Sequence, residues 1–209
     1  SIKLDENDYP HITYYDKSNH NLKYALKNES AWTMFTIDKA TDVGTATTLK
    51  LDENDLPHIS YHENKQNQLR YAYWNKTNWK VTIIDENNAI YPQPNLQLDA
   101  NNQPHIIYFN QINNSYNYTL KHAWEKSFNE WQIEKLTTTF LGMYPSFDID
   151  QNNTIHLIYM DNYSLQYASF SLYSQNIVDH AEGIPYLRTA LILSFFILTS
   201  YYFRKKNKN

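Results

Sequence analysis

One thirteen-residue pattern recurs along the chain and constrains the fold more than any other feature. The copies are LDENDYPHITYYD (Leu4–Asp16), LDENDLPHISYHE (Leu51–Glu63), LDANNQPHIIYFN (Leu98–Asn110) and the more divergent IDQNNTIHLIYMD (Ile149–Asp161). Their leading aspartates stand at 5, 52, 99 and 150, so the steps are 47, 47 and 51 residues. A steady period in the forties, built from short alternating segments, indicates a repeat architecture.

Each repeat contains four short segments with the character of β-strands. In the second repeat these segments are 47–51, 58–63, 69–74 and 79–84, rich in tyrosine and β-branched residues. The third and fourth segments recur as 22–28 with 32–38, 120–124 with 131–136, and 165–169 with 173–179. Four antiparallel strands per unit, repeated along a chain, predict the blades of a β-propeller.

The expected fold class is therefore all-β, with four blades over residues 1–179. The blade boundaries fall at about 1–44, 45–91, 92–142 and 143–179. Neighbouring blades cover both faces of a sheet, which fits the nearly continuous apolar runs IIYF and LIYM in the later repeats. Trp32, Trp79 and Trp131 open the outermost strands and are expected to fill the gaps between blades. A closed four-bladed ring is one arrangement of these blades.

The connection between the first two strands of each repeat reads Asn-Asp or Asn-Asn, at 7–8, 54–55, 101–102 and 152–153. The chain has only three glycines, and Asn and Asp are the next residues that tolerate positive φ. These pairs are expected to replace the Asn-Gly hairpin turn, with positive φ at both central residues. A calcium loop is the alternative, but the later ligands and closing Glu of such a loop are missing.

The run PHISY, followed by a Leu-x-Tyr-Ala strand and a later Trp, resembles the BNR-like, sialidase-type propeller repeats of exported prokaryotic proteins. The resemblance covers about residues 1–179, although no repeat carries the Ser-x-Asp-x-Gly-x-Thr-Trp box of that group. It implies an exported propeller with more blades than the four visible here. Sialidases grip a carboxylate with three arginines, whereas residues 1–183 contain only Arg70.

The amino-acid composition excludes some kinds of site and argues against some kinds of partner. The chain has no cysteine, which excludes a disulfide framework and any thiolate site. Of 18 basic residues, five follow Gly183, which leaves 13 against 22 acidic residues, a net charge of −9 for residues 1–183. Nucleic acid is therefore not an expected partner, because phosphate binding needs a basic face. No cofactor is expected either.

The long apolar run IPYLRTALILSFFILTSYYF occupies residues 184–203, after a linker at 180–183. About 20 apolar residues span a bilayer as a helix, and the basic tail RKKNKN at 204–209 is expected to stay cytoplasmic. The sequence thus predicts a single-pass protein of the cell membrane, with its propeller outside. A buried terminal helix and a processed surface-sorting tail are the alternatives.

One histidine stands at the head of the second strand in every repeat: His11, His58, His105 and His156. A metal ring is one interpretation. However, a metal needs ligands that converge within bonding distance, and equivalent positions on separate blades lie apart. A structural hydrogen bond to a nearby turn or blade is therefore expected, and no metal site is predicted.

The expected ligand site lies at the end of the blades where the strand two–three and strand four–one loops emerge. The second strands end there in a polar residue, and aromatic residues lie in the neighbouring loops. The candidates are Asp16, His62, Glu63, Tyr91, Asn110, Tyr116, Tyr118, Tyr144 and Asp161. Hydrogen-bond acceptors beside aromatic rings suit a glycan, and the net charge favours a neutral one. The alternative is that these polar residues only end the strands in water.

Three classes of function follow from these observations. The first is a membrane-anchored module outside the cytoplasm that binds a glycan or protein ligand, which is the interpretation preferred here. The second is a polysaccharide-degrading enzyme, a glycoside hydrolase or lyase, with part of its catalytic site in further blades. The third is a structural domain of the cell surface.

Overall fold

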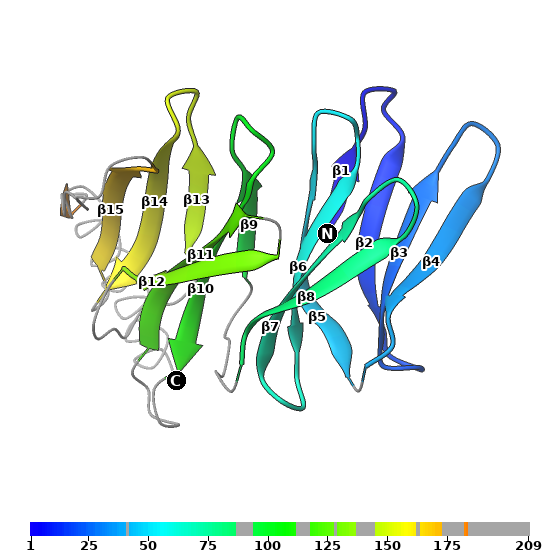
Figure 1. Cartoon of the computed structure of the whole chain (residues 1–209), viewed down its shortest axis with the longest axis horizontal. Coiled ribbons are helices and arrows are strands. Elements are labelled where there is room, and N and C mark those ends of the chain that lie inside the picture. Colours follow the sequence, from blue (N-terminus) through cyan, green and yellow to red (C-terminus); the bar gives the residue numbers. More distant parts are fainter. Residues whose placement is uncertain are drawn as a thin grey trace, which may run out of the picture.

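The computed structural model describes residues 1–40, 42–86, 94–111, 118–127, 129–136, 145–161, 164–172 and 182–183, with side chains of 161, 182 and 183 excepted. Within these ranges the protein contains β-strands and no helix (Figure 1). The strands form four antiparallel sheets of four, and each sheet is built from strands that are consecutive in the chain. The predicted all-β fold class and its four repeated units are confirmed.

The first two sheets, blades 1 and 2, follow the repeat closely. Blade 1 contains β1 (Ile2–Leu4), β2 (Pro10–Asp16), β3 (Asn21–Lys27) and β4 (Trp32–Asp38). Blade 2 contains β5 (Val43–Leu51), β6 (Pro57–Glu63), β7 (Gln68–Trp74) and β8 (Trp79–Asp85).

The third and fourth sheets, blades 3 and 4, have the same order. Blade 3 contains β9 (Asn95–Leu98), β10 (Pro104–Gln111), β11 (Tyr118–Ser127) and β12 (Glu130–Lys135). Blade 4 contains β13 (Ser146–Ile149), β14 (Thr154–Asp161), β15 (Ser164–Ser171) and the short β16 (Glu182–Gly183). The fourth strand expected at 173–179 lies outside the described residues, and β16, in the expected linker, pairs with β15.

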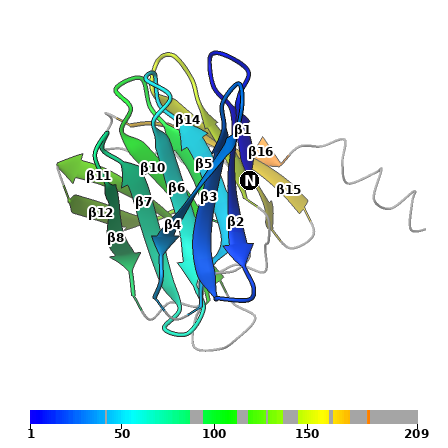
Figure 2. The ribbon, with the colours of Figure 1, turned by 90° about the vertical axis from the view of Figure 1, so that its right-hand side faces the viewer.

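The four blades stand side by side in chain order, with a face of each sheet against a face of the next (Figures 1 and 2). We call this row of four blades the fan. The first strands of the blades lie innermost, where β5 contacts β1 and β9, and β9 contacts β13. Along this inner row, Thr48 Oγ1 donates to the Pro94 carbonyl at 2.6 Å and Asn95 Nδ2 donates to the Pro145 carbonyl at 2.6 Å. Blades 1 and 4 form the two ends of the fan.

Every blade has two distinct faces because side chains alternate along a strand. We call the face that carries the second-strand histidine the forward face, since it points to the next blade. The opposite, rear face carries the second-strand tyrosine: Tyr14, Tyr61, Tyr108 or Tyr159.

Three separate apolar cores lie between the forward face of one blade and the rear face of the next, so each blade is held by its neighbours. In the core of blades 1 and 2, Leu22 and Tyr24 pack on Leu49, Ile59 and Tyr61.

The expected role of the tryptophans is confirmed for Trp79 and Trp131. Each packs its ring edge-on against a tyrosine of the preceding blade, Tyr24 and Tyr71 respectively, with ring centroids 5.1 Å apart in both cases. Trp32 occupies the same position in blade 1, where no described blade precedes it, and it is exposed.

A carboxylate at the end of the fourth strand joins consecutive blades. Asp38 ends β4 and accepts hydrogen bonds from the Tyr61 hydroxyl at 2.7 Å and from Arg70 Nη1 at 2.8 Å. Asp85 ends β8 and receives the Tyr108 hydroxyl at 2.6 Å and Lys121 Nζ at 2.8 Å. Both clusters are largely buried, so Arg70 has a structural partner here.

The turns that join first and second strands are organised by their leading aspartate. Asp52 Oδ1 accepts the backbone N–H groups of Asn54 and Leu56, both at 2.8 Å, and Asp5, Asp99 and Asp150 do the same in their turns. Positive φ occurs only at the second residue of each pair: Asp8, Asp55, Asn102 and Asn153. Our expectation of positive φ at both residues was wrong. The backbone N–H of Asp55 bonds the carbonyl of Asp52, so a left-handed residue follows an ordinary turn.

These turns also link one blade to the next. The backbone N–H of Glu6 donates to Asp55 Oδ2, that of Glu53 to Asn102 Oδ1, and that of Ala100 to Asn153 Oδ1, each at 3.4 Å. The side-chain oxygen of the positive-φ residue therefore accepts a hydrogen bond from the preceding blade.

Nδ1 of each second-strand histidine bonds a third-strand side chain of its own blade, and Nε2 lies 3.2–3.8 Å from the leading aspartate of the adjacent turn. His58 Nδ1 lies in hydrogen-bond contact with the Tyr71 hydroxyl, and its Nε2 lies 3.8 Å from Asp52 Oδ2. Burial lowers the pKa of His58, which favours the neutral ring. Within the described residues no group of histidine and carboxylate side chains is arranged to hold a metal ion.

No helix in the described residues is long and apolar enough to cross a membrane. The apolar run 184–203 and the tail 204–209 lie outside those residues, so the predicted anchor stays a prediction.

Candidate functional site

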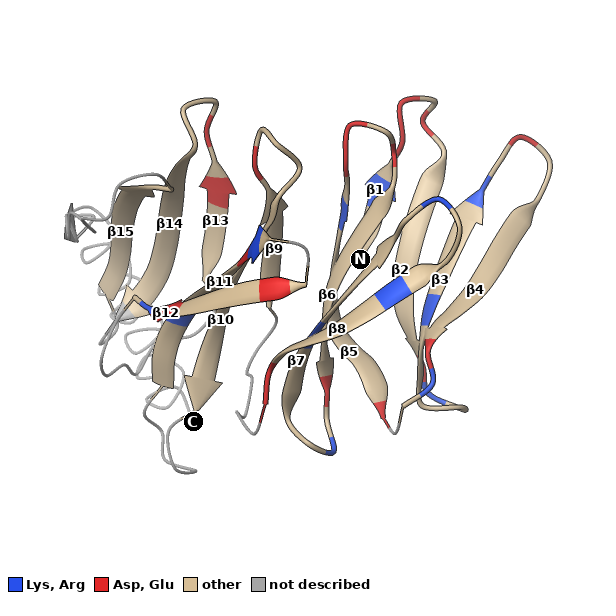
Figure 3. Cartoon of the chain, viewed as in Figure 1, with Lys and Arg blue, Asp and Glu red and all other residues tan. Residues whose placement is uncertain are grey.

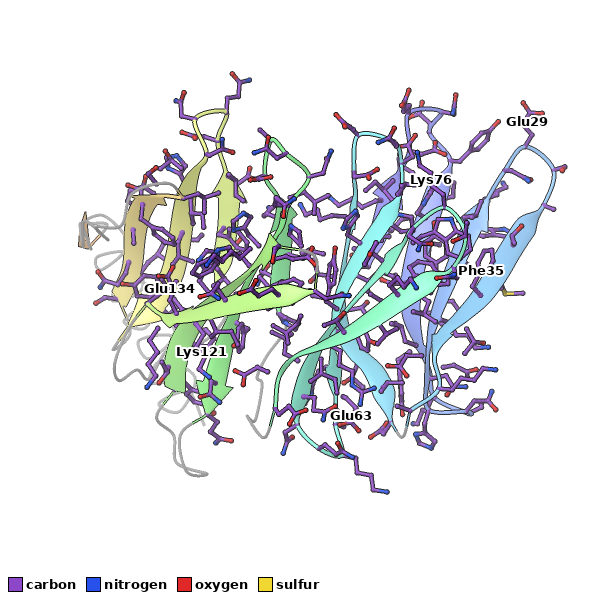
Figure 4. All side chains as sticks on the ribbon, in the orientation of Figure 1. Glu29, Phe35, Glu63, Lys76, Lys121 and Glu134 are labelled. Carbon is purple, nitrogen blue, oxygen red and sulfur yellow. The ribbon has the colours of Figure 1, made fainter. Side chains whose placement is uncertain are left out.

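Strand direction divides the loops of the fan between two ends. The Asp-led turns and the third-to-fourth strand hairpins share one end, which we call the turn end, and Glu29 and Lys76 lie there in Figure 4. The second-to-third strand loops and the connections between blades share the other end, the loop end, where Figure 4 places Glu63. Acidic segments mark strand ends of β6 and β8 at the loop end in Figure 3.

A polar and aromatic cluster, the Tyr15 cluster, lies at the loop end between blades 1 and 2. It consists of Tyr15, His20, Asp42, Thr45 and Asn64. The Tyr15 hydroxyl donates to Asp42 Oδ1 at 2.5 Å and lies 2.6 Å from His20 Nδ1. Asn64 Nδ2 donates to the other oxygen of Asp42 at 3.0 Å, and the Thr45 hydroxyl donates to Asn64 Oδ1 at 2.8 Å.

The local sequence explains how this cluster forms. Tyr15 comes at the end of β2, His20 lies at positive φ in the β2–β3 hairpin, and Asp42, also at positive φ, precedes β5. The backbone bonds from Val43 to His20 and from Asn64 to Asp42 hold the three loops together. Two hairpins and one inter-blade connection thus converge on a single carboxylate.

The electrostatics of the cluster fix its protonation. Hydrogen bonds from Tyr15 and then from Asn64 lower the pKa of Asp42, so this carboxyl is ionised. The hydrogen bond to Asp42 raises the pKa of Tyr15 to about 12, so the phenol keeps its proton. Since that proton goes to Asp42, the hydroxyl oxygen accepts from the Nδ1–H tautomer of His20.

Part of the cluster faces solvent. The side chain of His20 is 61% exposed and that of Asp42 38% exposed, while Tyr15 and Asn64 are half-buried. The rings of Tyr15 and His20 are tilted at 60° with centroids 6.0 Å apart. The cluster therefore presents two ring surfaces beside a carboxylate, an amide and an imidazole, which together offer both hydrogen-bond donors and acceptors.

The predicted site residues lie where expected along the strands, but most serve their own hairpins. Asp16 accepts the backbone N–H groups of Ser18 and Asn19, and buried Glu63 accepts those of Lys65 and Gln66. Asn110 is buried as well. Backbone N–H groups of their own hairpins thus already bond Asp16 and Glu63, and the role of these residues in ligand binding stays a prediction.

His62 borders the Tyr15 cluster and differs from the other predicted residues. Its Nε2 is buried and has no hydrogen-bond partner. Burial lowers the pKa of His62, and Glu63 and Asn64 oppose that effect. The half-buried His62 is thus a neutral imidazole with an unused nitrogen next to Asn64.

Of the predicted aromatic residues, Tyr118 is half-buried and packs edge-on against Phe109 at a centroid distance of 6.3 Å, as part of the core between blades 3 and 4. It therefore serves packing. Tyr91, Tyr116 and Tyr144 lie outside the described residues, and the side chain of Asp161 is not described.

The sequence pattern did not mark Tyr15, His20, Asp42, Thr45 or Asn64 as site residues. The available signal was departure from the repeat: Asp42 lies in the TDVGTA connection, whose sequence differs from the corresponding connections of the other repeats, and His62 stands where repeat 1 has Tyr15.

A pocket of about 360 Å³ lies elsewhere, on the forward face of blade 4. It is lined by Gln97, Ser146, Phe147, Asp148, His156, Ile158 and Tyr167. It contains one carboxylate, Asp148, whereas glycoside hydrolysis generally uses two carboxyl groups that flank the bond. In blades 1 to 3 the equivalent space is filled by the rear face of the next blade, so this pocket is an open blade face.

The chain is similar to an α-L-arabinanase from Penicillium chrysogenum complexed with arabinobiose, with a TM-score of 0.63, 14% identity, and coverage of 87% of this chain and 64% of that one. The fold is of the β-propeller type. The chain thus spans about two thirds of the length of that structure, and at this identity the likeness concerns the fold alone.

A second similar structure is a fucose lectin from Kordia zhangzhouensis in complex with methyl-fucoside, with a TM-score of 0.45, 18% identity, and coverage of 64% of this chain and 95% of that one. No protein-family model matches the sequence, and no curated protein matches it either.

Proposed function

We propose that this protein is a carbohydrate-binding β-propeller module and that the Tyr15 cluster binds a neutral glycan. The observation that carries this proposal is the partly exposed group of Tyr15, His20 and Asp42. A sugar offers hydroxyl groups at its edge and C–H groups on its face. The carboxylate, amide and imidazole can bond the former, and the Tyr15 and His20 rings can contact the latter.

The charge of the domain supports a neutral ligand. Asp42 is ionised, and residues 1–183 carry a net charge of −9. An anionic glycan would meet repulsion both at the cluster and at long range. The similar arabinanase is complexed with arabinobiose, a ligand of that protein.

The test is a glycan array with the purified full chain, followed by titration of the neutral glycans that bind. We expect His20→Ala and Asn64→Ala each to weaken binding about three- to tenfold, because each removes one hydrogen-bonding group from the ligand side. Tyr15→Phe, which keeps the ring and loses only the hydroxyl, should have a similar effect.

Asn54→Ala at the turn end is the matched control, since Asn54 is exposed and distant from the cluster. It should leave binding unchanged. Binding that survives all three cluster variants but is lost with Asn54→Ala would place the ligand at the turn end and reject the proposed site.

We also propose that residues 184–203 anchor the protein in a membrane, with residues 1–183 outside and 204–209 inside. The apolar run and its basic tail support this topology. Protease treatment of intact cells should release the propeller. Complete protection of the propeller would reverse the topology.

A further inference from the structure

The rear face of blade 1 is an apolar surface that nothing in the described chain covers. It carries Ile2, Leu4, Tyr14, Trp32 and Met34, all of them exposed large apolar side chains. Ile2 pairs with Ile12 across β1 and β2, and Met34 pairs with Ala25 across β3 and β4, so the surface extends over the whole blade.

Most positions of this surface are more buried in the other blades, although Val81 and Ile133, which correspond to Met34, are 42% and 40% exposed. The position of Ile2 in the repeat corresponds to Leu49, Leu96 and Phe147, which are 0%, 1% and 5% exposed, whereas Ile2 is 59% exposed. The position of Tyr14 corresponds to Tyr61, Tyr108 and Tyr159, which are all buried. The rear face of blade 1 therefore has the chemistry of a face that packs on the forward face of a preceding blade.

A matching forward face is open at the other end of the fan. His156 corresponds to His11, His58 and His105, whose side chains are 5–9% exposed, but the side chain of His156 is 42% exposed. Its Nδ1 still contacts the Tyr167 hydroxyl at 2.7 Å, and its Nε2 lies 3.2 Å from Asp150 Oδ2. Ile158 beside it is 40% exposed. The forward face of blade 4 is thus formed as in the other blades, but none of the described residues covers it.

We propose that two copies of this chain associate head to tail, with the rear face of blade 1 in one copy packed on the forward face of blade 4 in the other. The contact continues the interfaces that already join blades 1 to 4, and the chain supplies both halves of it. This proposal is independent of the proposed glycan site, because the Tyr15 cluster lies between blades 1 and 2.

The internal interfaces specify the contacts. Trp32 of one copy would lie edge-on against Tyr167 of the other, as Trp79 lies against Tyr24 and Trp131 against Tyr71. The backbone N–H of Gln151 would reach Asp8, as the N–H of Glu6 reaches Asp55. Ile2 and Leu4 would fill the 360 Å³ pocket beside His156 and Ile158. Since the two faces differ, the contact is heterologous, and it forms a ring if the rotation closes and a filament otherwise.

Thiol cross-linking tests this arrangement directly, because the chain has no cysteine of its own. One full-length chain carries Asn7→Cys, another carries Gln151→Cys, and the mixture is treated with a short bismaleimide. Asn7 and Gln151 are exposed turn residues, equivalent to Asn54 and Glu6. Glu6→Cys with Asn54→Cys in one chain is the positive control, since those turns meet between blades 1 and 2.

The expected product is a cross-linked dimer that joins Asn7→Cys of one chain to Gln151→Cys of the other. Leu4→Asp should reduce its yield at least about tenfold, because a charge replaces an apolar side chain that the contact buries. Leu4 is 56% exposed in the single chain, so this change leaves the fold of each copy intact. Circular dichroism of the variant checks that point.

Three outcomes would overturn the proposal. One is the absence of the mixed product where the internal control is cross-linked. Another is a cross-link that forms only within single chains carrying both substitutions, which means that the chain closes on itself. The third is a mixed product whose yield Leu4→Asp does not change.

Discussion

At the scale of single residues, blade 3 departs from the histidine–tyrosine pair of its neighbours. The tyrosine position is taken by His122, and His105 Nδ1 lies 3.0 Å from His122 Nε2. His122 Nδ1 contacts Glu134 Oε1 at 2.9 Å, and His105 Nε2 lies 3.8 Å from Asp99 Oδ2. Two buried imidazoles therefore share one hydrogen bond between two carboxylates. Burial, and then the neighbouring His122, lower the pKa of His105 to about 3.

This lowered pKa makes the stability of the protein depend on pH. Between the unfolded value of about 6.5 and the lowered folded value, the unfolded chain binds more protons than the folded one. Stability should therefore fall as the pH drops below about 6.5. From pH 7 to pH 5 we expect this histidine to cost about 1–2 kcal/mol, measured as the free energy of urea unfolding.

His105→Gln should reduce that loss, because glutamine keeps hydrogen-bonding groups and does not titrate. His20→Gln is the matched control, since His20 is exposed. An equal pH dependence in the wild type and the His105→Gln variant would show that this cluster is not responsible.

At the scale of strands, β5 depends on a glycine. Gly44 has φ of +100°, and a Cβ placed on it would lie 2.8 Å from the Cα of Leu22 in blade 1. The register of β5 against β6 shifts between Val43 and Thr45, so Gly44 sits in a bulge where two blades approach closely. The inter-blade connection can therefore run beside β3 only if this side chain is absent.

We expect Gly44→Ala to destabilise the protein by about 2–3 kcal/mol, because it adds both a backbone clash and an unfavourable φ. Urea unfolding of the purified variant measures the loss. Ala46→Gly is the control: Ala46 also has positive φ, at 52°, and a glycine there relieves strain. If Gly44→Ala unfolds at the same urea concentration as the wild type, the close approach to Leu22 is not rigid.

Most of the described strands could be predicted from sequence because they obey a local rule, although β5 begins at Val43, four residues before the expected start. The alternation of side chains, with a histidine and a tyrosine at fixed positions of the repeat, predicts β6 to within one residue of its observed start. Trp32 and Asp38 mark the two ends of β4. The Tyr15 cluster could not be predicted in the same way, since its members come from three loops and no spacing within the repeat encodes their meeting. For Glu63, the position at the end of β6 was predictable, but its contacts were not. Its carboxylate accepts the backbone N–H groups of Lys65 and Gln66, and these bonds depend on how the β6–β7 hairpin closes.

At the scale of the whole molecule, the blades are joined by separate apolar cores and by buried polar links. Asp38 forms one of these polar links, and Tyr61 and Arg70 of the next blade both donate hydrogen bonds to its Oδ2. Arginine keeps its charge in proteins, and Arg70 is buried beside Gln68 and Asp38. The ion pair makes the contact between blades 1 and 2 sensitive to the loss of one charge.

Asp38→Asn should therefore cost about 3–5 kcal/mol, because it leaves a buried guanidinium without its counter-charge. The free energy of urea unfolding measures the effect. Arg70→Met in the same chain should recover most of the loss, since it removes the unpaired charge. Asp16→Asn, which affects a carboxylate at a hairpin, should cost less than Asp38→Asn, and equal costs for the two would contradict the special role of Asp38.

The links between the turns have a consequence for how such a chain can change over evolutionary time. Blades 1 to 3 each donate a backbone N–H from one turn position, and blades 2 to 4 each offer a side-chain oxygen from another position of the same turn. A duplicated or deleted unit therefore joins its new neighbours through the same bonds, with no compensating change elsewhere. Gene rearrangements that respect the period can lengthen or shorten the protein. Extra residues within a unit are tolerated where they lie away from the turn, since the 51-residue third unit keeps its contacts to both neighbours.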